Sequence, residues 1–325
     1  MTEAASRPRF AIIDIARGVA IIAMVAYHLC WDLSYFRFIA ADVGRDPQWV
    51  FIARSILAVF LFLVGVGLVL GHGNGIRWRS FWRRWLFVVA GALIITTATY
   101  FVFPQSFVYF GVLHAIALFS LMGLAFVLTP LWLPVVVAAV VIALPFFHSD
   151  ALFNEKAWSW LGFWQVPPPT NDLVPVFPWF GAVLVGIVVT RLVLASSLAA
   201  RLAAIAASGR LPRVLAFMGR WSLLIYLLHQ PILFGLVYPA AAILQPQLAM
   251  RDADFLRSCQ STCTTGGTSA ELCVTYCQCG LEGVKTNELW NAIETGMVTA
   301  AEQAMLDAQN RQCSALIYPE LNLAQ

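Results

Sequence analysis

Hydrophobic residues along the chain are gathered into long runs that short polar segments separate. A helix that crosses the hydrocarbon core of a bilayer needs roughly 20 mostly apolar residues. Seven runs approach this length and predict seven spanning helices, at residues 11–36, 49–71, 85–103, 110–128, 131–147, 174–194 and 215–244. Pro231 and Pro239 lie inside the seventh run, where we expect them to kink or break the helix.

The composition supports a membrane location. Of the 325 residues, 60% are apolar and 11% are charged, and the mean hydropathy is +0.78. A soluble domain carries about 25% charged residues, so a protein of this composition is not expected to stay dissolved without lipid. The first run is too long for the core of a signal peptide, and we expect it to be an uncleaved anchor. The predicted fold class is an all-α, polytopic membrane helix bundle.

Charge placement predicts the orientation. Residues 1–250 contain 16 Lys and Arg against 8 Asp and Glu, whereas residues 251–325 contain 4 against 9. Lys and Arg near span ends favour the cytoplasmic side. The basic segments are the N-terminus, the second loop and the sixth loop, with Arg7, Arg9, Arg17, Arg77, Arg79, Arg83, Arg84, Arg191, Arg201, Arg210 and Arg213. These segments alternate as seven spans require, so we expect a cytoplasmic N-terminus and an extracytoplasmic C-terminal tail.

The tail predicts a second domain, and we place the boundary between residues 1–248 and 249–325. Six of the seven cysteines lie in it, at Cys259, Cys263, Cys273, Cys277, Cys279 and Cys313. Two pairs spaced i and i+4 share a helix face and flank a glycine-containing turn.

This spacing favours a helical hairpin held by disulfides in an exported segment. One such pairing joins Cys259 to Cys277 and Cys263 to Cys273, while Cys279–Cys313 holds a third helix near 287–310. Six cysteines allow 15 pairings, and a zinc site with Cys ligands is the alternative.

Three histidines lie at one level of the predicted bundle. At ~1.5 Å per helical residue, His28, His114 and His229 all fall in the outer half of different spans. Asp32 lies one turn beyond His28 on the same helix face. A histidine beside a carboxylate is the usual general-base arrangement, so we take these four residues as catalytic candidates. A single membrane histidine more often forms a helix–helix hydrogen bond, so the interpretation depends on their convergence.

Two further polar groups are candidates for binding. Arg54, Asp172 and Gln230 are expected near the histidines, where they could bind substrate. Asp14, Arg17 and Arg220 lie at the inner end, where they could bind an anionic donor or form a structural ion pair. No metal site and no nucleic-acid partner are expected.

Four blocks of the sequence resemble a known family. They are residues 13–28 (IDIARGVAIIAMVAYH), 110–117 (FGVLHAIA), 177–181 (FPWFG) and 219–232 (GRWSLLIYLLHQPI). In this order they are similar to the heparan-alpha-glucosaminide N-acetyltransferase catalytic-domain family, over residues from about 8 to 245.

The resemblance implies a bacterial-type acyltransferase of the inner (plasma) membrane with a periplasmic tail. Such an enzyme moves acetyl from cytoplasmic acetyl-CoA to an amine or hydroxyl of a sugar or glycan on the other side. His28 would then be a general base or acyl carrier that Asp32 orients. His114, or His229 with Gln230, would polarise the thioester or hold the oxyanion.

Two other functions remain open on the sequence. Histidines inside a bundle also relay protons in transporters and flippases, and histidines on facing helices can ligate haem b in electron carriers. The acyl group, the acceptor and the oligomeric state are left open by the sequence.

Overall fold

The computed structural model describes residues 10–295 and 298–318, so Arg7 and Arg9 of the predicted basic N-terminus lie outside the described residues. Within the described ranges, regular structure is helical apart from an isolated parallel bridge between Phe110 and Leu173. The chain forms two compact units. The first contains residues up to 32 and 42–235, and the second contains 33–41 and the residues from 236 onward.

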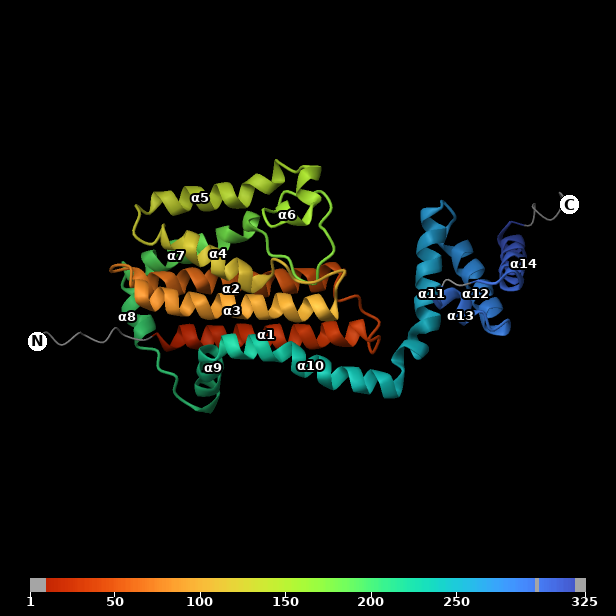
Figure 1. Ribbon diagram of the computed structural model, residues 1–325, viewed down its shortest axis with the longest axis horizontal. Coiled ribbons are helices and arrows are strands. Elements are labelled where there is room, and N and C mark those ends of the chain that lie inside the picture. Colours follow the sequence, from red (N-terminus) through yellow and green to blue (C-terminus); the bar gives the residue numbers. More distant parts are fainter. Residues whose placement is uncertain (1–9, 296–297, 319–325) are drawn as a thin grey trace, which may run out of the picture. The chain divides into compact units, whose positions relative to one another are not determined.

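Among the described residues, five helices are long and apolar enough to cross a membrane, which fits a multi-pass membrane protein. They are α1 (Ala11–Tyr35), α2 (Pro47–His72), α3 (Trp78–Val102), α7 (Val176–Leu194) and α10 (Ser222–Leu244). Two shorter apolar segments are α4 (Val112–Leu124) and α5 (Trp132–Ala143), the latter continued by η1 (Leu144–Phe146). In Figure 1 the axes of α1, α2 and α3 are roughly aligned with one another. The count of seven spans stays a prediction.

The start of the seventh predicted span is wrong, because residues 215–244 do not form one helix. An amphipathic helix, α9 (Arg210–Arg220), ends before Trp221, whose φ and ψ of −96° and 14° separate it from α10. Pro231 and Pro239 do not interrupt α10, which is continuous from Ser222. Prolines are tolerated in spanning helices because neighbouring groups satisfy the backbone atoms that they free.

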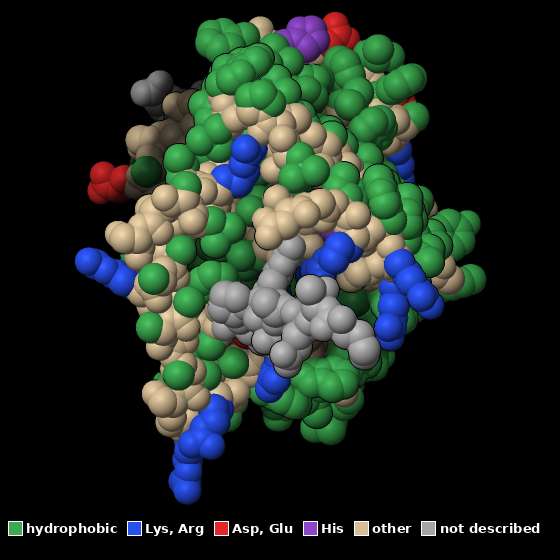
Figure 2. All heavy atoms as spheres, turned by 90° about the vertical axis from the view of Figure 1, so that its left-hand side faces the viewer, with side chains coloured by type: hydrophobic (Ala, Val, Ile, Leu, Met, Phe, Trp, Pro, Cys, Tyr) green, Lys and Arg blue, Asp and Glu red, His purple; other side chains and the backbone are tan. Residues whose placement is uncertain are grey.

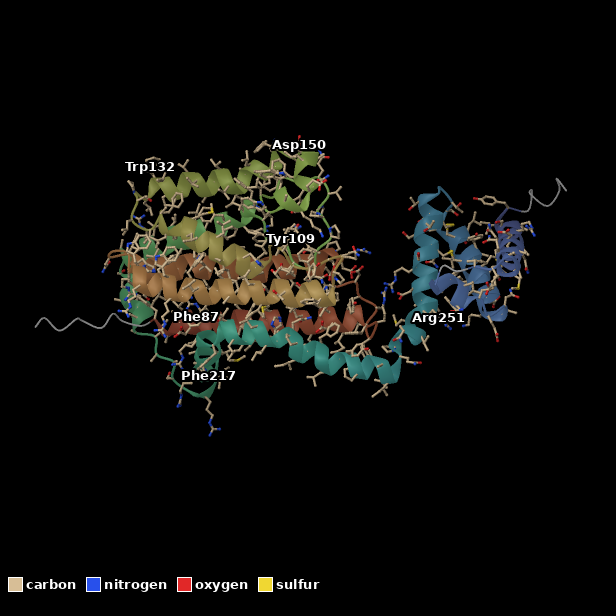
Figure 3. All side chains as sticks on the ribbon, viewed as in Figure 1. Phe87, Tyr109, Trp132, Asp150, Phe217 and Arg251 are labelled. Atoms are coloured by element: carbon tan, nitrogen blue, oxygen red, sulfur yellow. A yellow bond between two sulfur atoms is a disulfide. The ribbon has the colours of Figure 1, made fainter. Side chains whose placement is uncertain are left out.

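The core of the first unit lies between α2, α4, α5 and α7. Its largest fully buried side chains include Leu61, Phe119, Phe180, Leu184 and Ile187. Many large apolar side chains are exposed instead, such as Phe87 on α3 and Phe217 on α9 (Figure 3). Lipid can cover such surfaces, so the exposed apolar residues agree with a bilayer environment.

The connection between α5 and α7 contains η2 (Ala151–Asn154) and α6 (Lys156–Ser159). Its last part is fixed against the loop before α4. The backbone N–H of Asn171 donates to the Ser106 carbonyl at 2.8 Å, and that of Val174 donates to the Phe110 carbonyl at 3.0 Å. These bonds hold Asp172 at the start of α4. The remaining short helix, α8 (Leu198–Ala203), follows α7.

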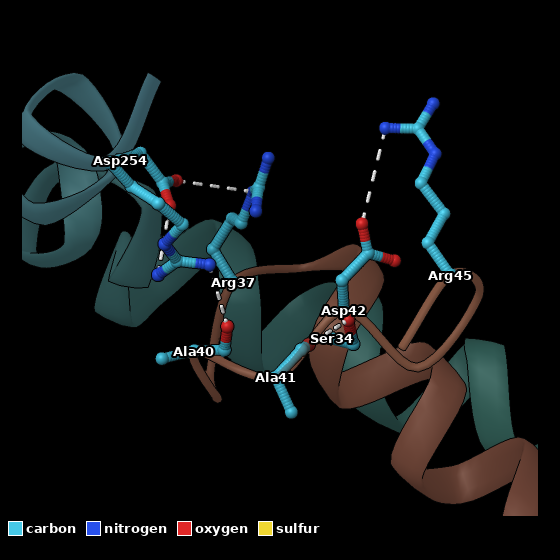
Figure 4. A network of polar contacts seen from close by, with 8 residues as sticks. Ser34, Arg37, Ala40, Ala41, Asp42, Arg45 and Asp254 are labelled. Atoms are coloured by element: carbon cyan, nitrogen blue, oxygen red, sulfur yellow. Dashed lines mark hydrogen bonds and ion pairs between the residues drawn. The ribbon is translucent and has the colours of Figure 1, made fainter. Parts of the chain in front are cut away.

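The second unit is built from α11 (Pro246–Thr265), α12 (Ala270–Thr286), α13 (Trp290–Thr295) and α14 (Ala300–Ile317). The third helix predicted near 287–310 is in fact the two helices α13 and α14. The segment 33–41 joins this unit through Arg37, which pairs with Asp254 at 3.4 Å, and through the Ala40 carbonyl, which accepts from Arg257 at 3.0 Å (Figure 4).

Three disulfides hold the helices of the second unit together, and their pairing is the one that the cysteine spacing favoured. They join Cys259 to Cys277, Cys263 to Cys273 and Cys279 to Cys313. Because all six sulfur atoms are bonded in pairs, these cysteines cannot supply the thiolate ligands of the alternative zinc site.

Two glycines allow a close helix crossing between α2 and α7. A Cβ atom at Gly65 would overlap the Val183 carbonyl oxygen, and one at Gly186 would overlap the Phe62 carbonyl oxygen. Small residues let membrane helices approach backbone to backbone. Any side chain at either position would therefore push the two helices apart.

We expect Gly65→Ala and Gly186→Ala each to lower the free energy of unfolding by about 1–3 kcal/mol through overpacking. The measurement is the thermal midpoint of the purified protein in detergent. Gly71→Ala, also on α2, is the control, because nothing lies within 4 Å of the added Cβ. Equal midpoints for Gly65→Ala and Gly71→Ala would contradict the assigned crossing.

Candidate functional site

Two helices bring together four residues of the predicted site. The rings of His28 on α1 and His229 on α10 are in contact, with centroids 4.8 Å apart and planes at 59°. Asp32, fully buried one turn further along α1, accepts a hydrogen bond through Oδ1 from Nε2 of Gln230 at 2.7 Å. Four of the residues expected from the sequence at this level thus form one cluster, which we call the histidine cluster.

The hydrogen bonds of His229 determine its tautomer. Nδ1 lies 2.7 Å from the backbone oxygen of Tyr226. A carbonyl oxygen can only accept, so Nδ1 carries the proton, and in the neutral ring Nε2 is a free base. Nε2 is therefore the atom of His229 that can take a proton from a substrate.

Three buried atoms of the histidine cluster have no hydrogen-bond partner among the described residues: His229 Nε2, Asp32 Oδ2 and Gln230 Oε1. Buried polar atoms are almost always paired, and an unpaired one costs about 1–3 kcal/mol. All three atoms are acceptors in these assignments, because the Gln230 amide nitrogen already donates to Asp32. A ligand rich in N–H or O–H donors would satisfy them.

Asp32 differs from its expected role. The sequence interpretation made it the partner of His28, but its carboxylate hydrogen-bonds to Gln230 across the helix interface. The amide N–H is a donor that suits a buried carboxylate, and the bond joins α1 to α10. The spacing of Asp32 from His28 gave no signal for this partner, which lies 198 residues away along the chain.

His114 is placed in a separate arrangement. Its Nδ1 accepts from the Gly111 backbone N–H at 3.3 Å, and its Nε2 lies 3.1 Å from Thr96 Oγ1. Thr96 in turn donates to the Val108 carbonyl at 2.8 Å. Both ring nitrogens therefore have partners in the protein, and the side chain closes the N-terminus of α4. Thr96, one of three threonines in an otherwise apolar run, was not among the residues that the sequence singled out.

Asp172 lies beside the same helix start. Its Oδ2 accepts from the Val112 backbone N–H at 2.8 Å, and its charge is close enough to interact with Tyr226 of α10. Gly111 makes room for this carboxylate, since a Cβ there would overlap Oδ2. Burial raises the pKa of Asp172 to about 6, although the hydrogen bond from Val112 opposes that rise.

Arg54 is not part of the histidine cluster. It is exposed on α2, and no contact joins it to His28, Asp32 or His229. Its role in substrate binding therefore stays a prediction that the structure does not support by contact.

The inner candidates gather where α9 crosses α1. Asp14 and Arg17 form an ion pair at 3.7 Å, and a Cβ at Gly219 would overlap the Asp14 carbonyl. Arg220 is the next residue and is exposed. Figure 2 faces this end of the first unit and shows Lys and Arg side chains around it. The described helix ends and loops that carry these Lys and Arg side chains contain one acidic residue, Asp14. This end of the first unit is therefore strongly basic.

The contact between His28 and His229 also bears on the haem alternative. With ring centroids 4.8 Å apart, the rings touch and leave no space for a porphyrin between them. The pair as arranged does not fit bis-histidine ligation.

A family model described as "Heparan-alpha-glucosaminide N-acetyltransferase, catalytic" matches residues 9–231. The match covers α1 through the first part of α10 and includes every residue of the histidine cluster. The second unit lies almost entirely outside it. No curated protein and no solved structure matches the chain.

The raised pKa of Asp172 predicts a pH-dependent stability. Because burial raises its pKa from 3.8 to about 6, the protonated carboxyl favours the folded state, and this contribution is lost as pH rises through about 6. Asp172→Asn keeps an acceptor for Val112 and stays neutral. We expect its thermal midpoint to match the wild type near pH 4 and to exceed it at pH 7, where its free energy of unfolding should be higher by up to about 3 kcal/mol.

The measurement is the thermal midpoint in detergent across this range, with Asp150→Asn as the control. Asp150 is an exposed loop carboxylate that caps η2 by accepting from Leu152 N–H at 2.8 Å. Parallel pH curves for the wild type and Asp172→Asn would contradict the assigned protonation.

Proposed function

The chain belongs to the heparan-alpha-glucosaminide N-acetyltransferase catalytic-domain family, a family of transmembrane acetyltransferases, and from this membership we propose its reaction. The protein transfers acetyl from acetyl-CoA, bound at the basic end, to an amine or hydroxyl of a sugar or glycan at the histidine cluster. The observation that carries the proposal is the unprotonated, buried and unpartnered Nε2 of His229.

The basic end would bind the donor. CoA carries several phosphates, and the cations that surround this end attract them. Arg17 is 11 residues before His28 on α1, which corresponds to about 17 Å along the helix axis. The thiol arm would extend along α1 over this distance and bring the acetyl group toward the histidine cluster.

The histidine cluster would then perform the transfer. The nitrogen or oxygen of the acceptor attacks the acetyl carbonyl carbon while His229 Nε2 takes the proton that the acceptor loses. The bond between carbon and sulfur breaks, and the CoA sulfur leaves as a thiolate. This thiolate takes the proton from His229 Nε2, which returns His229 to its neutral form. Asp32 Oδ2 and Gln230 Oε1 would accept hydrogen bonds from neighbouring sugar hydroxyls. His28, in contact with the base, would stabilise charge or carry the acyl group transiently.

The proposed orientation follows from the basic end. Because Lys and Arg near the ends of spans favour the cytoplasm, the donor end would face the cytoplasm of a bacterial cell. The acceptor end and the disulfide-bonded second unit would then face the periplasm, where disulfides persist.

We expect His229→Ala to lower the rate of acetyl transfer by about 100-fold or more, the range that a general base contributes. The assay supplies acetyl-CoA and a panel of amino sugars, and it detects the acetylated sugar by mass spectrometry. His148→Ala is the control, because His148 is an exposed loop histidine. His114→Gln should lower the thermal midpoint, because it disturbs the hydrogen bonds at the start of α4. It should lower the rate of acetyl transfer much less than His229→Ala does. A wild-type rate in both His229→Ala and His28→Ala would overturn the proposed chemistry.

The donor site has its own test. Arg220→Gln should weaken acetyl-CoA binding about tenfold, which is about 1.4 kcal/mol, because it removes one cation from the basic end. Calorimetry with the purified protein measures the Kd, and the wild-type Kd should rise with salt. Arg45→Gln, an exposed arginine in the loop before α2, is the matched control. Equal Kd values for the two variants would contradict this donor site.

A further inference from the structure

Helix α9 carries an apolar strip that is exposed on the surface of the first unit. Leu211, Val214 and Phe217 follow one another at every third position, so they share one side of the helix. These residues are 69%, 54% and 53% exposed. Trp221 lies just beyond the helix, is 52% exposed, and has its ring 6.2 Å from that of Phe217. The strip therefore runs along the helix into the turn before α10.

A different side of α9 packs on the start of α1. Ala216 and Gly219 are buried. A Cβ at Gly219 would overlap the Asp14 carbonyl, and a Cβ at Gly18 would overlap the Leu215 backbone, so the two helices touch through their backbones. Asp14 and Gly18 lie near the beginning of α1, and α10 begins just after α9. Helix α9 is thus placed at the ends of two helices that are long and apolar enough to cross a bilayer.

The direction of α9 fits the surface of a bilayer. Figure 1 shows α9 running across the axis of α1. Trp221, with φ and ψ of −96° and 14°, interrupts the helical backbone between α9 and α10 and allows this change of direction. Because α1 would cross the bilayer, a helix that runs across its end lies close to the plane of the interface. In that position α9 meets lipid headgroups and acyl chains as well as α1.

The charged residues of α9 are all arginines. They are Arg210, Arg213 and Arg220, and all three are exposed. Arg213 lies three residues from Arg210 and seven from Arg220, so these cations form a row beside the apolar strip. The wider segment 191–221 contains five arginines and no Asp or Glu. The surface that α9 presents is therefore both apolar and strongly cationic.

This combination indicates the chemistry of the partner. A helix in the plane of the interface, with large apolar side chains on one side and Lys or Arg beside them, is typical of helices that bind membrane surfaces. Cations close to such a surface are attracted to anionic lipids. A soluble anion would pair with the arginines but leave the apolar strip in water. An uncharged lipid would cover the strip but leave the arginines without counter-ions. An anionic phospholipid matches both features.

We propose that α9 is an interfacial helix that binds anionic phospholipid. Leu211 and Phe217 lie among the acyl chains, and Arg210 and Arg213 pair with headgroup phosphates. Arg220 remains assigned to the proposed donor site. Lipid binding itself does not require acetyl transfer. If the proposed function holds, the bound lipid would also fix α9 beside Asp14 and Arg17, which form the ion pair at the donor end.

The test measures which lipid lies against α9 in a bilayer. The full-length protein is placed in phosphatidylcholine nanodiscs that contain a small fraction of photoactivatable phosphatidylglycerol or of photoactivatable phosphatidylcholine. Both probes carry the same diazirine in an acyl chain. After illumination, mass spectrometry of the digested protein measures the labelling of residues 211–221. We expect phosphatidylglycerol to label this segment about tenfold more than phosphatidylcholine does, because at least two cations attract its headgroup.

Two variants of α9 separate charge from structure. Arg210→Gln/Arg213→Gln should lower the labelling by phosphatidylglycerol to the level of phosphatidylcholine. Arg213 Nε also donates to the Gly209 carbonyl at 2.9 Å, so Arg210→Lys/Arg213→Lys tests whether this bond matters instead. The lysine variant keeps both charges and should be labelled as the wild type is. Arg45→Gln/Lys156→Gln, which removes two exposed cations outside α9, is the matched control and should also keep the wild-type labelling.

Four outcomes would each overturn the proposal. They are equal labelling of residues 211–221 by the two lipids in the wild type, unchanged labelling in the glutamine variant, an equal loss in the glutamine and lysine variants, and an equal loss in the control. Absence of labelling by both lipids would also overturn it, because protein, such as a second copy of this chain, would then cover the strip. Acetyl-CoA is absent from the assay, so none of these outcomes depends on the acetyltransferase proposal.

Discussion

A polar atom buried among apolar helices has no water to bond, so it must find a partner in the protein or in a ligand. This constraint separates the histidines of the bundle. Both nitrogens of His114 bond within the protein, whereas Nε2 of His229 has no partner among the described residues. The first arrangement stabilises the start of a helix, and the second leaves an unpaired ring nitrogen, which is the proposed base. Similar depth in the membrane therefore does not imply a similar role.

The hydrogen bond from Gln230 to Asp32 joins the helices that carry His28 and His229. It pairs Oδ1 of Asp32 with one N–H of Gln230, and it leaves Asp32 Oδ2 and Gln230 Oε1 as buried acceptors without a partner among the described residues. The same contact thus stabilises the helix interface and leaves two acceptors for the proposed substrate. Close crossings at glycines, such as Gly18 against the Leu215 backbone, bring α9 onto α1 at the opposite end. The two ends of the proposed transmembrane reaction are thus both positioned by direct contacts to α1.

The second unit is stabilised in a different way from the membrane helices. It has few apolar residues compared with the membrane helices, and three disulfides join its helices instead of a large core.

Periodicity, composition and charge placement along single segments are enough to predict the helical membrane architecture and the basic end, and the cysteine spacing to predict a disulfide-bonded tail. The residue pattern also identified His28, Asp32, His229 and Gln230 as candidates. The structure was needed to select one of the 15 disulfide pairings, and to show that Asp32 bonds to Gln230, that His114 bonds at the start of α4 and that Arg54 is exposed on α2. These outcomes depend on which side chains from distant segments meet. Hydrogen bonds across helix interfaces are set by rotation and tilt of the helices, which residue spacing does not specify.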